Sequence, residues 1–141
     1  MVKILCLLLL IALCRTHFSY AMALNAEDIC AEETKISMAK VWASYREESI
    51  SEEDEEYGKY FHCVWLMKKL MDVNGSIDKT EVQNFLEKEI SQDFTLNASL
   101  KQTLKEAAER CSKLDSASVQ RKSVKLKNCI TSTIRSSVFP L

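Results

Sequence analysis

The sequence predicts an all-α fold, a compact bundle of about six short helices. The chain has 141 residues but only two glycines and one proline, so the turn residues that sandwiches and barrels need are nearly absent. Glu, Lys, Ala and Leu are common, and apolar residues recur at helical spacing along most of the chain. Hydrophobic residues make up 47% and charged residues 28%, which is typical of one globular domain and not of a disordered chain.

The N-terminal segment, residues 1–21, is predicted to be a secretory signal peptide. Lys3 supplies the positive end, residues 4–13 form an apolar run, and small residues follow. Cleavage is expected after Ala21, with Ala23 as the alternative. The apolar run is about half of the roughly 20 residues that a transmembrane helix needs, so a membrane anchor is disfavoured. We therefore expect a secreted, extracellular protein whose mature domain spans residues 22–141.

The charge balance argues against binding to nucleic acid. Removing Lys3 and Arg15 from the 19 basic residues leaves 17, against 20 acidic residues, a net charge of −3. A nucleic-acid-binding domain of this size is expected to carry a basic excess.

The mature domain keeps four cysteines, Cys30, Cys63, Cys111 and Cys129. An even number of cysteines in an oxidising compartment predicts two disulfides, and the sequence alone leaves three pairings open. A zinc site is disfavoured because no two of these cysteines have C-x-x-C spacing and His62 is the one mature histidine.

The first half of the mature chain predicts three helices. Asn25 is a suitable N-cap for a helix from residue 26, and the spacing in 36–45 places Trp42 and Tyr45 on one side of a second helix. Seven of the ten residues in 47–56 are acidic, which indicates a solvated helix start, and Ser51 with Asp54 resembles a capping box that opens the next helix. Residues 57–71 are apolar nearly all round and predict the central helix of the core.

The second half predicts three more helices. Residues 72–78 form a polar turn, and Asp78 followed by Glu81 marks a new helix. A calcium loop at 72–83 is disfavoured because Ile77 and Gln83 replace the required glycine and glutamate. The stretches 97–114 and 124–134 each place one cysteine on an apolar stripe. A basic patch heads the last helix and is expected to be solvated; its members are Arg121, Lys122, Lys125 and Lys127.

This arrangement resembles a known family. Cys30 precedes an amphipathic stretch, the acidic run 47–56, the segment 60–65 (YFHCVW), the segment 70–78 (LMDVNGSID) and a late cysteine pair. The pattern is similar to that of the insect odorant-binding proteins of the pheromone-binding and general odorant-binding kind. That family usually has six cysteines, and its second and fifth positions are Lys59 and Gln120 here. The chain therefore resembles the minus-C subgroup, and the resemblance implies disulfides Cys30–Cys63 and Cys111–Cys129.

The resemblance implies a carrier that binds small hydrophobic molecules, such as odorants or pheromones, in an internal apolar cavity. The chain shows no catalytic triad, metal site or phosphate-binding glycine loop, so we expect no enzyme activity and no cofactor. A cavity between amphipathic helices is a usual site for an apolar ligand. We expect large apolar side chains to line it, although ordinary core packing explains each of them equally well: Trp42, Tyr45, Phe61, Trp65, Met67, Phe85 and Leu104, with Phe139 of the tail as a lid.

Several expectations concern partners and modification. Tyr45 is expected to hydrogen-bond an alcohol, aldehyde or ester oxygen of the ligand. The resemblance also implies release of ligand near an odorant receptor or membrane, and it leaves a homodimer open. Asn74 and Asn97 begin N-glycosylation sequons.

Three alternatives remain open at this point. A secreted helical signalling or venom protein with a solid core would use the same two disulfides. A phospholipase-type hydrolase is disfavoured because no His-Asp pair accompanies a calcium loop. A carrier of the same fold for lipids or amines differs only in its cargo.

Overall fold

A computed structural model describes residues 25–138 of the chain. The predicted signal peptide 1–21 and Phe139 lie outside this range. The described part contains six α-helices and no named strand, which confirms the predicted all-α class. The helices are α2 (Ala26–Thr34), α3 (Met38–Arg46), α4 (Glu55–Met67), α5 (Lys79–Ser91), α6 (Ala98–Ser112) and α7 (Val119–Val138).

Short polar side chains fix where the helices begin. Asn25 accepts a hydrogen bond from the Asp28 N–H at 2.8 Å, and Asp78 accepts from the N–H groups of Thr80 and Glu81 at 2.8 and 3.0 Å, as the sequence predicts.

The prediction that the next helix starts at Ser51 is wrong. Asp54 is the N-cap of α4, and its side chain accepts a hydrogen bond from the Tyr57 N–H. The acidic run is therefore mostly a connection between α3 and α4.

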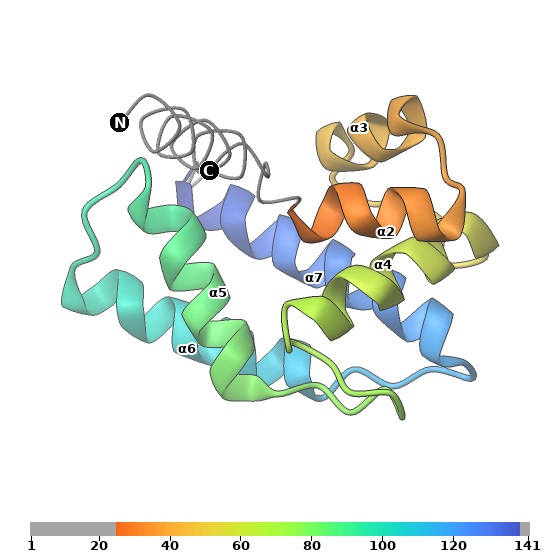
Figure 1. Cartoon of the computed structure of the whole chain (residues 1–141). Helices are drawn as coiled ribbons and strands as arrows, with labels where there is room; N and C mark the ends of the chain where they lie inside the picture. Colours follow the sequence, from red (N-terminus) through yellow and green to blue (C-terminus); the bar gives the residue numbers. More distant parts are fainter. Residues whose placement is uncertain (1–24, 139–141) are drawn as a thin grey trace, which may run out of the picture.

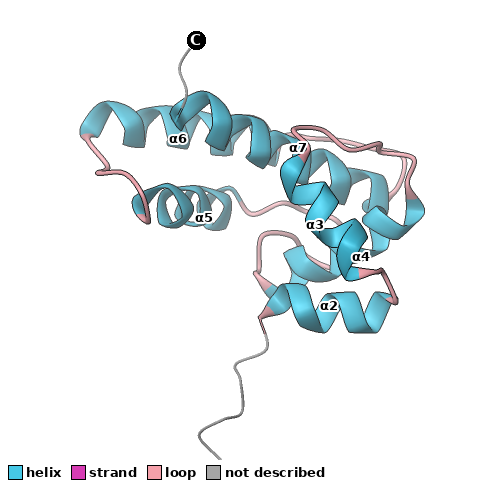
Figure 2. Ribbon diagram, turned by 90° about the horizontal axis from the view of Figure 1, so that it is seen from above, coloured by secondary structure: helices cyan, strands magenta, loops and turns pink. Residues whose placement is uncertain are grey.

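The helices form two groups that meet at the contact between α4 and α7. Helix α2 packs on α4, and α5 packs on α6. Viewed from above, α5 and α6 lie on one side and α2, α3 and α4 on the other (Figure 2). In Figure 1, α7 runs behind α4 and reaches both groups. Within residues 25–138, no helix is both long and apolar enough to cross a membrane.

Helix α4 is the centre of the core, as its apolar sequence predicts. Tyr60, Phe61 and Val64 are fully buried, and Trp65 donates from Nε1 to the Ser123 carbonyl of α7 at 2.9 Å. Two turns earlier in α4 the two helices come very close, since a Cβ atom placed on Gly58 would lie 2.7 Å from the Cβ of Gln120. This close approach explains a glycine at the fourth position of α4, where alanine is normally preferred within a helix.

Two disulfides cross-link the helices in pairs. Cys30–Cys63 joins α2 to α4, and Cys111–Cys129 joins α6 to α7, with Cα–Cα distances of 5.7 and 5.9 Å. This is the pairing that the family resemblance implies. Neither bond connects the first helix pair to the second.

Side chains of α7 hold the end of α3 and the connection that follows it. Lys127 donates from Nζ to the Glu47 carbonyl at 2.7 Å, and Arg135 donates to the Arg46 carbonyl at 2.6 Å. Asn128 bonds both the N–H and the carbonyl of Ile50, each at 3.0 Å. The backbone of residues 46–50 is thus fixed on the last helix by long-range hydrogen bonds.

The burial of Lys127 corrects one expectation from the sequence. The sequence predicts a solvated basic patch that includes this lysine, but Lys127 is 1% exposed. Burial lowers the pKa of its ammonium group, and the charge of Arg135 adds to the effect. The other members of the patch stay nearer the surface, and two of them face the acidic run. Arg121 pairs with Glu53, and Lys125 lies 3.7 Å from Glu52.

We expect Gly58→Ala to lower the free energy of unfolding by about 1–2 kcal/mol, because crowding against Gln120 outweighs the gain in helix propensity. Chemical denaturation measures the change. The same substitution in a Gln120→Gly background, which lacks the opposing Cβ, should cost clearly less. Equal costs in both backgrounds would contradict the contact.

We expect Asn128→Ala to lower the free energy of unfolding by about 2 kcal/mol, since it leaves both backbone groups of Ile50 without their partner. The control is Asn84→Ala, a change at an exposed position of α5, which should stay within about 0.5 kcal/mol. Similar losses in the two variants would mean that the bonds to Ile50 contribute little.

Candidate ligand-binding site

Four aromatic rings form a row that crosses from α3 through α4 to α5. Tyr45 contacts Phe61 edge-on at a centroid distance of 6.2 Å, Phe61 stacks on Trp65 at 5.6 Å, and Trp65 meets Phe85 edge-on at 6.2 Å. We call these four residues the aromatic row. Phe61 and Trp65 lie on successive turns of α4, which is why one helix supplies the middle of the row.

Two further tyrosines of α4 flank Phe61. Tyr60 contacts it edge-on at 4.9 Å, and Tyr57 lies at 6.2 Å. Both lie in the predicted central helix but are not among the predicted site residues. The spacing of residues 57, 60, 61, 64 and 65 follows one helical face, and this signal was present in the sequence.

The hydroxyl groups of these tyrosines differ in their environments. The Tyr57 hydroxyl donates to the Lys40 carbonyl at 3.1 Å, which ties α4 to α3. The Tyr60 hydroxyl is buried and has no hydrogen-bond partner. Burial raises the pKa of Tyr60 to about 12, and the neighbouring Tyr45 hydroxyl opposes this shift. Burial of its hydroxyl end also raises the pKa of Tyr45, although the residue as a whole is 42% exposed.

The predicted lining residues occupy three kinds of environment. Phe61, Trp65 and Leu104 are buried in one hydrophobic core, and Phe85 is half-buried against it. Met67 is exposed, with its sulfur 3.5 Å from that of Cys30. The predicted lining set therefore extends from the core to the surface.

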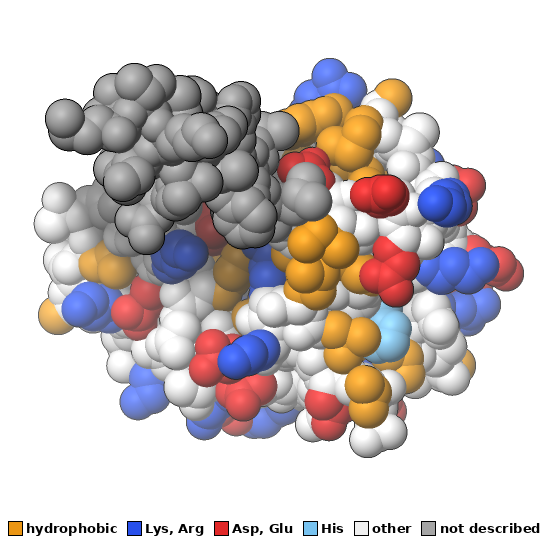
Figure 3. All heavy atoms as spheres, in the orientation of Figure 1, with side chains coloured by type: hydrophobic (Ala, Val, Ile, Leu, Met, Phe, Trp, Pro, Cys, Tyr) orange, Lys and Arg blue, Asp and Glu red, His pale blue; other side chains and the backbone are white. Residues whose placement is uncertain are grey.

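Helix α3 presents its large apolar side chains outward. Trp42 is 63% exposed, and Met38 and Tyr45 are exposed beside it, while Val41 and Ser44 form the buried side. Hydrophobic side chains gather over α2, α3 and the end of α4 in Figure 3, whereas charged side chains are spread over the rest of this face. Trp42 and Tyr45 thus share a side, as the spacing predicts, but Trp42 faces solvent, whereas the Tyr45 ring reaches Phe61 at the edge of the core.

A charged rim lies over the Phe85 end of the row. Lys68 pairs with Glu27 of α2 at 2.7 Å, and its ammonium group lies 5.1 Å from the centre of the Phe85 ring. An open hollow of about 290 Å³ adjoins it, lined by Lys68, Glu81, Asn84, Phe85, Lys88 and Glu89. This hollow gives one side of Phe85 access to solvent.

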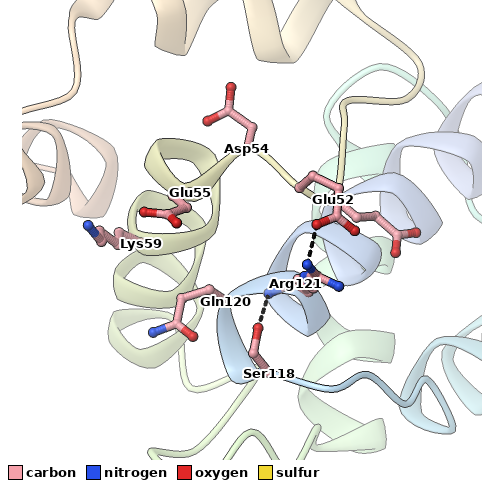
Figure 4. Close-up of a pocket in the computed structure, with 8 residues that line it drawn as sticks. Glu52, Asp54, Glu55, Lys59, Ser118, Gln120 and Arg121 are labelled. Carbon is pink, nitrogen blue, oxygen red and sulfur yellow. Dashed lines mark hydrogen bonds and ion pairs between the residues drawn. The ribbon is translucent and has the colours of Figure 1, made fainter.

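Two other hollows are lined mainly by polar residues. One of about 340 Å³ lies between the acidic run and the start of α7 and includes Lys59, Gln120 and Arg121 (Figure 4). The other, of about 680 Å³, surrounds the turn between α4 and α5. All three hollows are open to solvent, so the enclosed apolar cavity stays a prediction.

The two sequons lie at exposed positions. Asn74 is in the turn after α4, where Asp72 Oδ1 accepts from the N–H groups of Asn74 and Ser76 at 2.9 and 2.8 Å. Asn97 caps α6 and accepts from the Leu100 N–H at 2.8 Å. Across the described residues, no group of three His, Cys, Asp or Glu side chains is arranged to hold a metal ion.

Comparison with protein families assigns this helical, disulfide-linked fold. The model of the PBP/GOBP family matches residues 19–133, which is most of the chain. The chain belongs to the PBP/GOBP family. Proteins of this insect odorant-binding family are secreted, non-enzymatic carriers of hydrophobic ligands, and the chain is accordingly an odorant- or pheromone-binding carrier. Searches of curated proteins and of solved structures found no match.

We expect Phe61→Ala to lower the free energy of unfolding of this PBP/GOBP protein by about 3–5 kcal/mol, because it removes the ring that joins Tyr45, Tyr60 and Trp65. Chemical denaturation followed by circular dichroism measures the loss. Phe94→Ala, at a residue that is 44% exposed, is the control and should cost below about 1 kcal/mol. A small effect at Phe61 would mean that the row is not part of the stable core.

Proposed function

We propose that the chain binds its hydrophobic ligand along the aromatic row. The observation that carries this proposal is the continuity of the four rings, which extend from partly exposed Tyr45 through the core to half-buried Phe85. Aromatic rings offer a large apolar surface, and the exposed ends of the row give a ligand a way to reach it.

The expected affinity follows from the size of such a ligand. Burying roughly 300 Å² of apolar surface at about 25 cal/mol per Å² yields about 7 kcal/mol before the costs of association. A dissociation constant near the micromolar range is the natural scale. Phe139 and the end of the tail would close the site as a lid, and release would occur near an odorant receptor or membrane.

We further propose that the chain is of the minus-C kind. Lys59 of α4 and Gln120 of α7 stand where the family has its second and fifth cysteines, and both side chains line the polar hollow of Figure 4. A crosslink there would join the two disulfide-linked helix pairs. Without it, the two pairs move more freely relative to each other, and the pocket should accept ligands of varied shape.

Binding is tested by displacement of an apolar fluorescent dye from the secreted, oxidised protein. We expect saturable uptake in the micromolar range and displacement by fatty alcohols, esters, terpenoids and aromatics, several of them with similar affinity. We expect Phe85→Ala to weaken binding about tenfold, since it shortens the row, whereas Phe94→Ala should leave it unchanged.

Two results would count against these proposals. A folded, helical protein that takes up no dye would exclude the site and favour a solid core. A sharp preference for one compound would contradict the broad selectivity expected of the minus-C kind.

A further inference from the structure

The Tyr60 hydroxyl is an unexplained polar group in the core. Its side chain has no exposed surface, and its polar neighbour, the Tyr45 hydroxyl, does not complete a hydrogen bond to it. Buried hydroxyls nearly always have a partner, because leaving one without a partner costs stability. Phenylalanine would fill the same space without this cost, so the oxygen at position 60 calls for a functional explanation.

The surroundings of this hydroxyl place it at the aromatic row. The Tyr60 ring packs edge-on against Phe61, and the hydroxyl lies beside that of Tyr45, whose ring contacts the same Phe61. Tyr45 is partly exposed, so it lies between the Tyr60 hydroxyl and the surface. Tyr57 differs from Tyr60, because its hydroxyl donates a hydrogen bond to the Lys40 carbonyl and thereby links α4 to α3.

We propose that the Tyr60 hydroxyl donates a hydrogen bond to a neutral oxygen atom of the bound ligand, and that the adjacent Tyr45 hydroxyl makes the second polar contact. This inference rests on the proposed binding site at the aromatic row. It names the ligand class as apolar molecules with an alcohol, aldehyde, ketone or ester group, rather than pure hydrocarbons. Tyr60 is then a specificity-determining residue in addition to those that the sequence predicts.

The charges near Tyr60 disfavour a negatively charged ligand group. Glu27 and Asp28 of α2 are the charged residues that act on this hydroxyl, and both raise its pKa. A carboxylate placed there would meet like charges, whereas a neutral oxygen would not. With a pKa of about 12, the phenol also keeps its proton at physiological pH and remains a donor.

The test compares ligands that share one carbon chain: decan-1-ol, decanal, decane and decanoate. The affinity for each ligand is measured by displacement of an apolar dye from the oxidised wild-type protein and from Tyr60→Phe, with Tyr57→Phe as the matched tyrosine control on the same helix. We expect Tyr60→Phe to weaken the binding of decanol and decanal about five- to tenfold and to change the affinity for decane less than twofold. Tyr57→Phe should leave the ratio of decanol to decane affinity unchanged, and wild-type protein should bind decanol more tightly than decanoate at neutral pH.

Stability provides a second readout that does not depend on binding. Removing an unpartnered buried hydroxyl should leave the unfolding midpoint of Tyr60→Phe unchanged or higher, whereas Tyr57→Phe should lower it. An unchanged ratio of decanol to decane affinity in Tyr60→Phe, or a lower midpoint, would overturn the role of Tyr60 and leave the binding site standing. A folded wild-type protein that binds none of the probes would instead reject the site itself, and the role of Tyr60 with it.

Discussion

The contact between α4 and α7 is the constraint on which the rest of the structure depends. Each disulfide links two helices on one side of this contact, α2 to α4 and α6 to α7. The two linked pairs are joined to each other by close packing at Gly58 and by the bond from Trp65 to the Ser123 carbonyl. Because no described crosslink spans this interface, its side-chain fit determines how the halves are placed.

The same contact positions the aromatic row. Helix α4 directs Trp65 partly toward α7 and partly toward Phe85, so the row and the interface share one residue. Helix α7 also holds residues 46–50, which sets where α3 ends and therefore where Tyr45 lies. The proposed ligand-binding surface is thus built by α3, α4 and α5, and contacts with α7 determine how these helices are placed.

The regular parts of this fold could be predicted from the sequence, and the reasons are local. Asn25 and Asp78 bond N–H groups within three residues, so their role as caps follows from the chain alone. The central helix could also be predicted, since its apolar residues lie on most sides. Trp42 shows what helical spacing cannot predict. The spacing places it beside Tyr45 but does not indicate which side of α3 faces the core.

Some side-chain environments could not be predicted from the sequence, because they depend on partners far away in the chain. Lys127 is one of four basic residues in a span of seven, and only the Glu47 carbonyl, 80 positions away, explains why this lysine is buried. Tyr60 and Tyr57 look alike within the same apolar helix, and only the Lys40 carbonyl distinguishes them. In both cases a backbone oxygen from another element determines the role of the side chain. That role cannot be predicted from residue type alone.

The pairing of the cysteines also gives the chain a particular topology. The two described disulfides close separate loops, 30–63 and 111–129, which neither overlap nor enclose one another. A single cut in the exposed connection between α5 and α6 would therefore yield two fragments, each with its own closed ring, that neither disulfide links. The two fragments would be held together by the contacts of α4 and α5 with α6 and α7 and by the hydrogen bonds from α7 to residues 46–50, so this small domain is equivalent to two complementary fragments joined in one chain.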